Sequence, residues 1–219
     1  YVDLPSVQRY EAHYYTAQQL QQLLELIRDD PLYPLVKITT IYGLRRSELL
    51  GLQWDSIDFD RNTLTIRHTV TKVSKTAEKD KTKNASSYRS FPLLDEAREI
   101  FLQARKEERE NRRLMGKDYH DNPYVFKWPD GRPIAPDYVT HHFAALLRKH
   151  KLPRIRFHEL RHSCASLLLS NGFALKDVQE WLGHSDIKMT ANIYGHLDVA
   201  RKQSIADKMG SLFSAAENT

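Results

Sequence analysis

The sequence predicts a mainly α-helical fold that carries a small antiparallel β-sheet. Leucine, isoleucine and valine recur at helical spacing through most of the chain, whereas residues 62–70 alternate and are rich in β-branched side chains. Hydrophobic residues make up 41% of the 219 residues, which is enough for a folded core. No apolar run approaches the length of a membrane span, so a membrane protein is not expected.

Three helices are expected in the first quarter of the chain. Thr16 and Gln19 form a capping-box pattern, and the apolar spacing that follows continues until Pro31 ends the helix. A second apolar run predicts a helix that ends at Gly43, and a third helix begins around Ser47. Residues 1–12 have no such periodicity and are interpreted as a linker.

A long β-hairpin is expected next. The run NTLTIRHTV at residues 62–70 reads as one strand, and YRSFPL at residues 88–93 is its plausible partner. Residues 71–87 between them are polar and rich in lysine, which predicts a mobile tip.

The second half of the chain is predicted to be helical. Residues 95–114 alternate arginine and lysine with glutamate, as a helix with a solvated face does. Asp137 is interpreted as the cap of the helix that follows the turn at residues 128–136, and Asn171-Gly172 as a left-handed helix end. Helices are expected over 137–151, 158–170, 175–183 and 198–210.

The charge and the cysteine content narrow the class of partner and compartment. A formal net charge of +5 favours a polyanionic partner, although only mildly. The single cysteine, Cys164, excludes an internal disulfide and is typical of a reducing cytoplasm. Because the chain begins with Tyr1 and not with methionine, we expect it to be a fragment or a processed product.

Residues 157–163, FHELRHS, contain two overlapping patterns. His158, Glu159 and His162 form H-E-x-x-H, which is typical of zinc proteases. Arg161 shares a helix face with His158, and its fixed positive charge would oppose a dication. A guanidinium beside an imidazole instead suits a phosphodiester, so we favour the phosphate interpretation.

Three motifs together resemble one enzyme family. GLRRSEL at residues 43–49, HELRH at 158–162 and LGH at 182–184, followed by Tyr194, resemble the boxes of the tyrosine recombinase (phage-type integrase) family in their order. The last box and KTKNASSYRSFPL at residues 81–93 are most similar to integrases of conjugative transposons and related prophages. The resemblance implies a tyrosine recombinase catalytic domain over residues 13–219.

The resemblance implies that two arginines clamp the scissile phosphate without a metal. These are Arg45 and Arg161, and Arg46 is a rival for the first position or otherwise a contact to the DNA backbone. Glu48 is expected to orient a clamp arginine or the helix start, and Glu159 to act as a helix N-terminal charge.

The remaining roles implied by the resemblance belong to four side chains. Tyr194 would be the nucleophile, His158 its base, and His184 a hydrogen-bond donor to the phosphate. Lys83 fits best as the general acid on the hairpin, with Lys81 second. Without the motifs, a tyrosine at a helix end and a histidine after glycine would be read as packing residues. The side chains expected to contact DNA are Lys75, Lys79, Lys81, Arg46 and Arg89.

The implied activity is site-specific cutting and rejoining of double-stranded DNA through a 3′-phosphotyrosine and a Holliday junction. No cofactor is expected, because the transesterification retains the bond energy. The resemblance implies a tetramer on paired duplexes, a dimer on one site, and a location at the nucleoid of a bacterial cytoplasm. Residues 1–12 would be the remnant of a linker from core-binding and arm-binding domains that are absent. The C-terminal tail, with Leu212 and Phe213, would dock on a neighbouring protomer or fold back.

Three alternatives stay open at this point. The chain could be a DNA-binding relative that cannot cut, a type IB topoisomerase-like enzyme that nicks and closes one duplex, or a zinc hydrolase.

Overall fold

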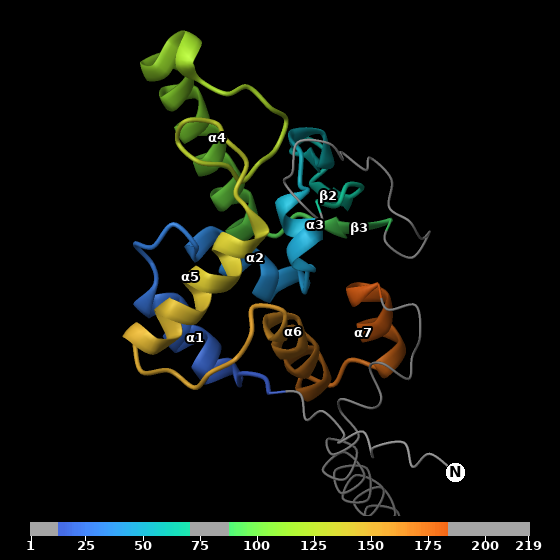
Figure 1. Ribbon diagram of the computed structural model, residues 1–219. Coiled ribbons are helices and arrows are strands. Elements are labelled where there is room, and N and C mark those ends of the chain that lie inside the picture. Colours follow the sequence, from blue (N-terminus) through green and yellow to red (C-terminus); the bar gives the residue numbers. More distant parts are fainter. Residues whose placement is uncertain (1–12, 71–87, 184–219) are drawn as a thin grey trace, which may run out of the picture.

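The computed structural model describes residues 13–70 and 88–183, which form a helical body with a small antiparallel sheet (Figure 1). The fold class predicted from the sequence is confirmed. The helices are α1 (Ala17–Leu26), α2 (Tyr33–Tyr42), α3 (Arg46–Leu50), α4 (Asp95–Met115), α5 (Pro136–Lys149), α6 (Glu159–Ser170) and α7 (Leu175–Leu182). The strands are β1 (Ile57–Asp58), β2 (Thr63–Ile66) and β3 (Arg89–Pro92), and short 3-10 turns lie at Trp54–Ser56 and Gly116–Asp118. None of the helices in these ranges is both long and apolar enough to cross a membrane.

The first helix begins and the second helix ends where local sequence signals place them, whereas α1 ends at Leu26, earlier than the predicted stop at Pro31. The Thr16 hydroxyl accepts the Gln19 N–H at 3.3 Å, and the Gln19 side chain accepts the Thr16 N–H at 2.9 Å, so the capping box is confirmed. Gly43 ends α2 in the left-handed conformation, with φ 61°. The chain therefore turns sharply before α3, whose first residue is Arg46.

Gly43 also occupies a tightly packed position, which leads to a stability prediction. A Cβ at this position would lie 2.3 Å from Leu182 Cδ2 and 3.3 Å from Cys164 Sγ, in addition to the positive φ. We expect Gly43→Ala to lower the free energy of unfolding by about 2 kcal/mol or more, as measured by urea denaturation. Gly172→Ala is the control, because Gly172 has φ +89° but nothing within 4 Å of its added Cβ. Equal losses in the two variants would show that packing at Gly43 contributes nothing.

The sheet contains the predicted hairpin pair and one strand that was not predicted. β2 pairs antiparallel with β3 in the register Thr63↔Pro92 to Ile66↔Arg89, and β1 adds to the other edge of β2. β1 is only two residues long, so it has no alternating pattern to detect. The predicted hairpin tip, residues 71–87, lies outside the described residues.

The prediction that the first hairpin strand extends to residue 70 is wrong for the last four residues. The strand ends at Ile66, and the backbone then leaves the sheet to pack against α3. The Val70 N–H donates to the Ser47 carbonyl at 2.9 Å, and Gly51 leaves the room that the His68 backbone occupies. The Val70 N–H is therefore committed to α3 and is not available to the ladder.

The charged helix α4 is anchored to the rest of the fold as well as solvated, and Glu108 is one of its anchors. Glu108 accepts hydrogen bonds from Trp54 Nε1 at 2.6 Å and from Lys127 Nζ at 2.8 Å. Burial raises the pKa of Glu108, but the Lys127 hydrogen bond and charge outweigh it and lower that pKa below its ordinary value. Glu108 therefore ties α4 to the segment that leads into α5.

Two of the predicted helix ends differ in detail from the structure. Asp137 does not cap α5: the N-cap is Ala135, and Pro136 and Asp137 lie in the first turn, where proline needs no N–H partner. At the end of α6, Asn171 has φ −87° and only Gly172 is left-handed, with φ 89°. The helix predicted over 198–210 lies outside the described residues.

The last two described helices complete the core and place the middle motif. α6 packs against α1, α2 and α7, and Figure 1 shows it lying beneath α2 in the body of the molecule. Nearly all of its first two turns are buried, including the charged side chains of Glu159 and Arg161. A charged side chain in a core needs partners. Arg161 donates to the Gly43 carbonyl at the end of α2 and lies near Glu48 on α3, whereas Glu159 accepts the Arg156 N–H.

Candidate active site

Two motifs that are more than one hundred residues apart in the sequence meet at a buried carboxylate. Glu48, in the first turn of α3, is 1% exposed. Its Oε2 accepts the Arg45 N–H at 2.8 Å, and its Oε1 accepts Arg45 Nη1 at 2.6 Å. Arg89 from β3 donates to both oxygens, at 3.1 and 3.0 Å, in a bidentate pair. We call Arg45, Glu48, Arg89 and Arg161 the arginine cluster.

The charge of Glu48 is maintained by its partners. Burial on its own would raise the pKa of this carboxyl group, because it penalises the charged form. The hydrogen bond and charge of Arg89, together with those of Arg45, more than reverse this effect and lower the pKa of Glu48 to about 2. The carboxylate is therefore ionised at any physiological pH.

Arg161 is the most enclosed cation of the arginine cluster. Its side chain is 1% exposed, its Nη1 donates to the Gly43 carbonyl at 2.7 Å, and the same atom lies 4.0 Å from Glu48 Oε2. Burial, followed by the charge of Arg45, lowers the pKa of Arg161 to about 9. It still carries its positive charge at neutral pH, held in place by the end of α2.

Arg45 is the accessible arginine of the cluster. Its side chain is 32% exposed, and as the N-cap residue of α3 it projects from the turn that follows Gly43. Its Nη2 donates to the Gly183 carbonyl at 3.1 Å. Gly183 ends α7 with φ 66°, so the first residues of the third motif also reach the arginine cluster.

His158 lies at the start of α6, one turn from Arg161. Its side chain is exposed on one side, and the burial of the rest, followed by the charges of Arg161 and Arg45, lowers its pKa. The imidazole is therefore largely neutral at pH 7 and able to accept a proton. This lowering by both arginines also shows that His158 and the two guanidinium groups share one electrostatic environment.

The side chains of the H-E-x-x-H pattern, His158, Glu159 and His162, are not arranged as the ligands and the base of a zinc site would be. The rings of His158 and His162 contact each other edge to face, with centroids 5.3 Å apart, and burial followed by the charge of His158 lowers the pKa of His162 to about 4. The Glu159 carboxylate accepts the Arg156 backbone N–H and is 2% exposed, so it serves the helix start. Within residues 13–70 and 88–183, no three His, Cys, Asp or Glu side chains are grouped as metal ligands would be.

The other predicted site residues fall into three groups: one on the α5 side, one inside the arginine cluster, and several outside the described part of the chain. Arg46 turns away from Glu48 and donates to the Pro136 carbonyl at 3.2 Å and to the Thr140 hydroxyl, both on α5. Arg89 lies inside the arginine cluster, and its side chain is only 8% exposed. The predicted residues that lie outside the described part of the chain are Lys75, Lys79, Lys81, Lys83, His184 and Tyr194.

Glu48 is the residue whose importance the sequence shows least. The sequence suggests that it orients an arginine or the helix start, and in the structure it does both. Its bidentate contact with Arg89 joins residues 41 positions apart, and no local spacing signals such a pair. In the sequence, the signal is a glutamate three residues after Arg45 in the same motif.

The arrangement is suited to binding an anion and moving a proton beside it. One buried and one accessible guanidinium group supply fixed positive charge with directed donors, and a neutral imidazole lies next to them. A phosphodiester carries a single negative charge that such a pair can neutralise.

Comparisons with known proteins agree with this chemistry. The sequence model of the phage integrase family matches residues 13–201. A "Tyrosine recombinase XerC-like" protein of Caldanaerobacter subterraneus subsp. tengcongensis is 30% identical over 93% of this chain and 55% of its own length. The "Transposase from transposon Tn916" of Enterococcus faecalis is 30% identical over 83% of this chain and 47% of its own length. The chain thus spans about half the length of these relatives.

A solved structure shares the fold. The Tn1549 transposon integrase in complex with transposon right end DNA superposes with a TM-score of 0.74 at 24% identity, over 91% of this chain and 67% of that chain. At this identity the likeness concerns the fold.

Proposed function

The chain belongs to the phage integrase family, and from that premise we propose that residues 13–219 are the catalytic domain of a site-specific tyrosine recombinase. It would cut and rejoin double-stranded DNA during the integration and excision of a mobile element. The observation that supports this most is the meeting of Arg45 and Arg161 at Glu48, next to His158. A buried guanidinium group held beside an accessible one and an imidazole supplies the fixed positive charge and the proton acceptor that phosphoryl transfer requires.

The proposed reaction is a pair of transesterifications at one phosphorus. The phenolic oxygen of Tyr194 attacks the scissile phosphate, the bond from phosphorus to the 5′ oxygen breaks, and a 3′-phosphotyrosine forms. His158 takes the phenolic proton, and Lys83, with Lys81 as the second candidate, protonates the departing 5′ oxygen. Reversal by a 5′ hydroxyl from another strand rejoins the DNA, and the bond energy is kept throughout, so no cofactor is needed.

The remaining groups stabilise the charge that builds on the phosphate. Arg45 and Arg161 would neutralise its non-bridging oxygens, and His184 would add a hydrogen bond. Lys75 and Lys79 would contact the DNA backbone together with Lys81 and Arg46. The ion pair of Arg89 with Glu48 favours a positioning role for this residue over the direct DNA contact expected from the sequence.

The assembly and location are proposed on the same basis. A tetramer would hold two duplexes while strands exchange through a Holliday junction, with a dimer on a single site. The C-terminal tail with Leu212 and Phe213 would dock on a neighbouring protomer or on its own domain, and the protein would act on DNA at the nucleoid of a bacterial cytoplasm.

A nicked suicide substrate tests the proposed chemistry. We expect the wild-type chain to accumulate a covalent protein–DNA adduct, visible as a band of lower mobility on a denaturing gel, because the nick lets the 5′ hydroxyl fragment diffuse away. Tyr194→Phe removes the attacking oxygen and should abolish the adduct, whereas Tyr119→Phe, at a half-buried tyrosine next to α4, should keep it.

This test and two further measurements, supercoiled DNA relaxation and treatment with a chelator, would point to the alternatives. DNA binding without any adduct in the wild-type chain would identify a relative that cannot cut. Relaxation of supercoiled DNA without ligation between two different duplexes would identify a type IB topoisomerase-like activity. Loss of activity with a strong chelator would reopen the zinc interpretation.

A further inference from the structure

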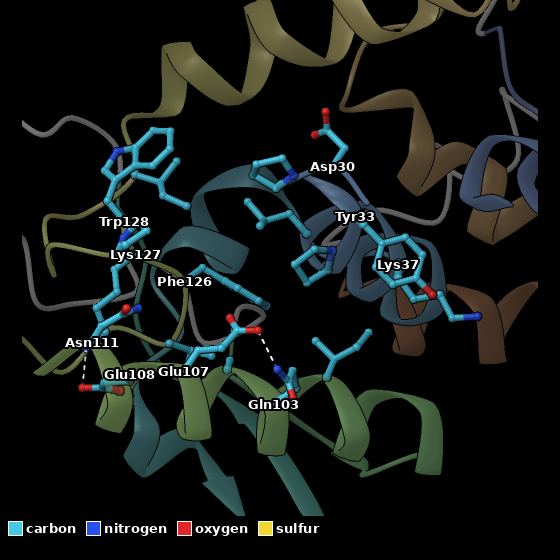
Figure 2. A pocket seen from close by; sticks show the side chains of 18 of the residues that line it. Asp30, Tyr33, Lys37, Gln103, Glu107, Glu108, Asn111, Phe126, Lys127 and Trp128 are labelled. Atoms are coloured by element: carbon cyan, nitrogen blue, oxygen red, sulfur yellow. Dashed lines mark hydrogen bonds and ion pairs between the residues drawn. The ribbon is translucent and has the colours of Figure 1, made fainter. Parts of the chain in front are cut away.

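A groove lies where α2, α4 and the segment 119–138 face one another (Figure 2). Its volume is about 760 Å³, within the range of sites that hold small ligands or a few side chains. Of the described residues, its lining includes none of Arg45, Glu48, Arg89 and Arg161. The groove is therefore separate from the arginine cluster and has no part in the proposed reaction.

The walls of the groove are aromatic and apolar. Tyr33 and Pro34 come from α2, Phe126 and Trp128 from the segment before α5, and Tyr138 from α5 itself. The rings of Trp128 and Tyr138 contact each other edge to face, with centroids 4.7 Å apart. Such surfaces bind apolar side chains, and their ring faces attract cations.

An acidic stripe runs along the α4 side of the groove. Glu96, Glu99, Gln103 and Glu107 line it at helical spacing, all four are exposed, and Figure 2 shows Gln103 and Glu107 at its edge. Glu107 lies eleven positions after Glu96, which at a rise of 1.5 Å per residue is about 16 Å along the helix. This is too long for one small cation and fits several consecutive residues of a polypeptide.

The charge of the groove is opposite to that of the chain. Six acidic side chains line it against three basic ones, in a protein whose formal net charge is +5. The acidic residues are Asp29, Asp30, Glu96, Glu99, Glu107 and Glu108, and the basic residues are Arg28, Lys37 and Lys127. Such a surface repels a nucleic acid backbone and attracts a basic partner.

The wall opposite the stripe is held rigidly before any partner binds. Lys127 Nζ donates to Glu108 at 2.8 Å and to the Asn122 carbonyl at 3.0 Å. Arg112 pairs with Asp121 at 2.7 Å and lies over the Tyr119 ring, 5.2 Å from its centroid. A preformed wall lowers the entropy cost of binding.

We propose that this groove is a docking site for a basic segment of another protein, with an aromatic or aliphatic side chain against Tyr33, Phe126 and Trp128 and lysines or arginines along Glu96, Glu99 and Glu107. The observations that carry this are the acidic stripe on a basic chain, its length and the preformed aromatic wall. A protein bound there would be tethered to the recombinase without covering the arginine cluster.

The test selects ligands from a random peptide library displayed on phage, with the full chain as bait. We expect the recovered peptides to combine two or more lysines or arginines with an aromatic or leucine anchor. Glu99→Lys with Glu107→Lys should weaken a recovered peptide about tenfold or more in fluorescence anisotropy, because two attractions become repulsions. Ala104→Trp, which fills the groove, should have a similar effect. Glu110→Lys, an exposed charge reversal on α4 that does not line the groove, should leave the affinity unchanged.

Three outcomes would overturn the proposal. One is recovery of peptides with no excess of basic residues, and another is equal binding to the double variant and to wild type. The third is concentration-dependent self-association that the double variant abolishes, since the occupant would then be a second copy of this chain. None of these experiments measures DNA cleavage, so their result does not depend on whether the proposed recombinase activity is correct.

Discussion

Replacing Arg161 by lysine is expected to slow formation of the covalent DNA adduct by about 10²–10³-fold while changing DNA affinity only a few-fold. The guanidinium group is 1% exposed and donates to the Gly43 carbonyl at 2.7 Å, so its remaining donors are held in a fixed direction. An ammonium group keeps the charge but lacks the planar fork, and it cannot bond to the end of α2 and to a phosphate oxygen with the same geometry. Single-turnover cleavage of the nicked substrate and a separate binding titration measure the two quantities.

A matched substitution shows whether the effect is specific to Arg161 or follows from any replacement of an arginine by lysine. Arg109 is an exposed arginine on α4 that lies outside the arginine cluster, and Arg109→Lys should leave cleavage unchanged. Equal reductions in cleavage and in binding by Arg161→Lys would mean that Arg161 serves as a DNA anchor and not as a transition-state clamp. Unchanged cleavage would remove Arg161 from the proposed mechanism altogether.

Local signals predicted the parts of this fold that depend on neighbours in the chain. The capping box at Thr16, the left-handed end at Gly43 and the two strands that pair as 63–66 with 89–92 each show signals in a few adjacent residues. The motifs likewise located Arg45 and His158 on the correct loops and helix ends. These features need no knowledge of what packs against them.

The features that the sequence did not predict all arise from tertiary contacts. β1 exists because two residues reach the edge of β2, and the chain after β2 (Thr63–Ile66) is drawn to α3, where Val70 bonds to Ser47. Arg89 is predicted to contact DNA, yet its guanidinium group pairs with Glu48. A charged residue next to a basic loop has the same local signature whether it points to solvent or into a core.

Glu48→Gln is expected to have the largest effect on stability. The carboxylate accepts bonds from Arg45 and Arg89 and lies 4.0 Å from Arg161, so the variant leaves two buried guanidinium groups and the more accessible Arg45 without an anion. Breaking a buried pair in this way costs about 3–5 kcal/mol of unfolding free energy. The charge of Glu48 also raises the pKa of Arg161, so its loss makes the charged guanidinium group less favourable at the centre of the proposed clamp.

The pH dependence of stability isolates this contribution. The pKa of Glu48 is lowered from 4.5 to about 2 in the folded protein, so its stabilising effect is fully present above pH 4.5 and is lost as the pH falls toward 2. A shift of this size corresponds to about 3 kcal/mol. Between pH 5 and pH 2, wild type should therefore lose about 3 kcal/mol more than Glu48→Gln does in urea denaturation. Glu110→Gln, at an exposed carboxylate on α4, should follow the wild-type curve. Parallel curves for wild type and Glu48→Gln would mean that the three arginines do not depend on this carboxylate, and the geometry proposed for the phosphate clamp would then lack its support.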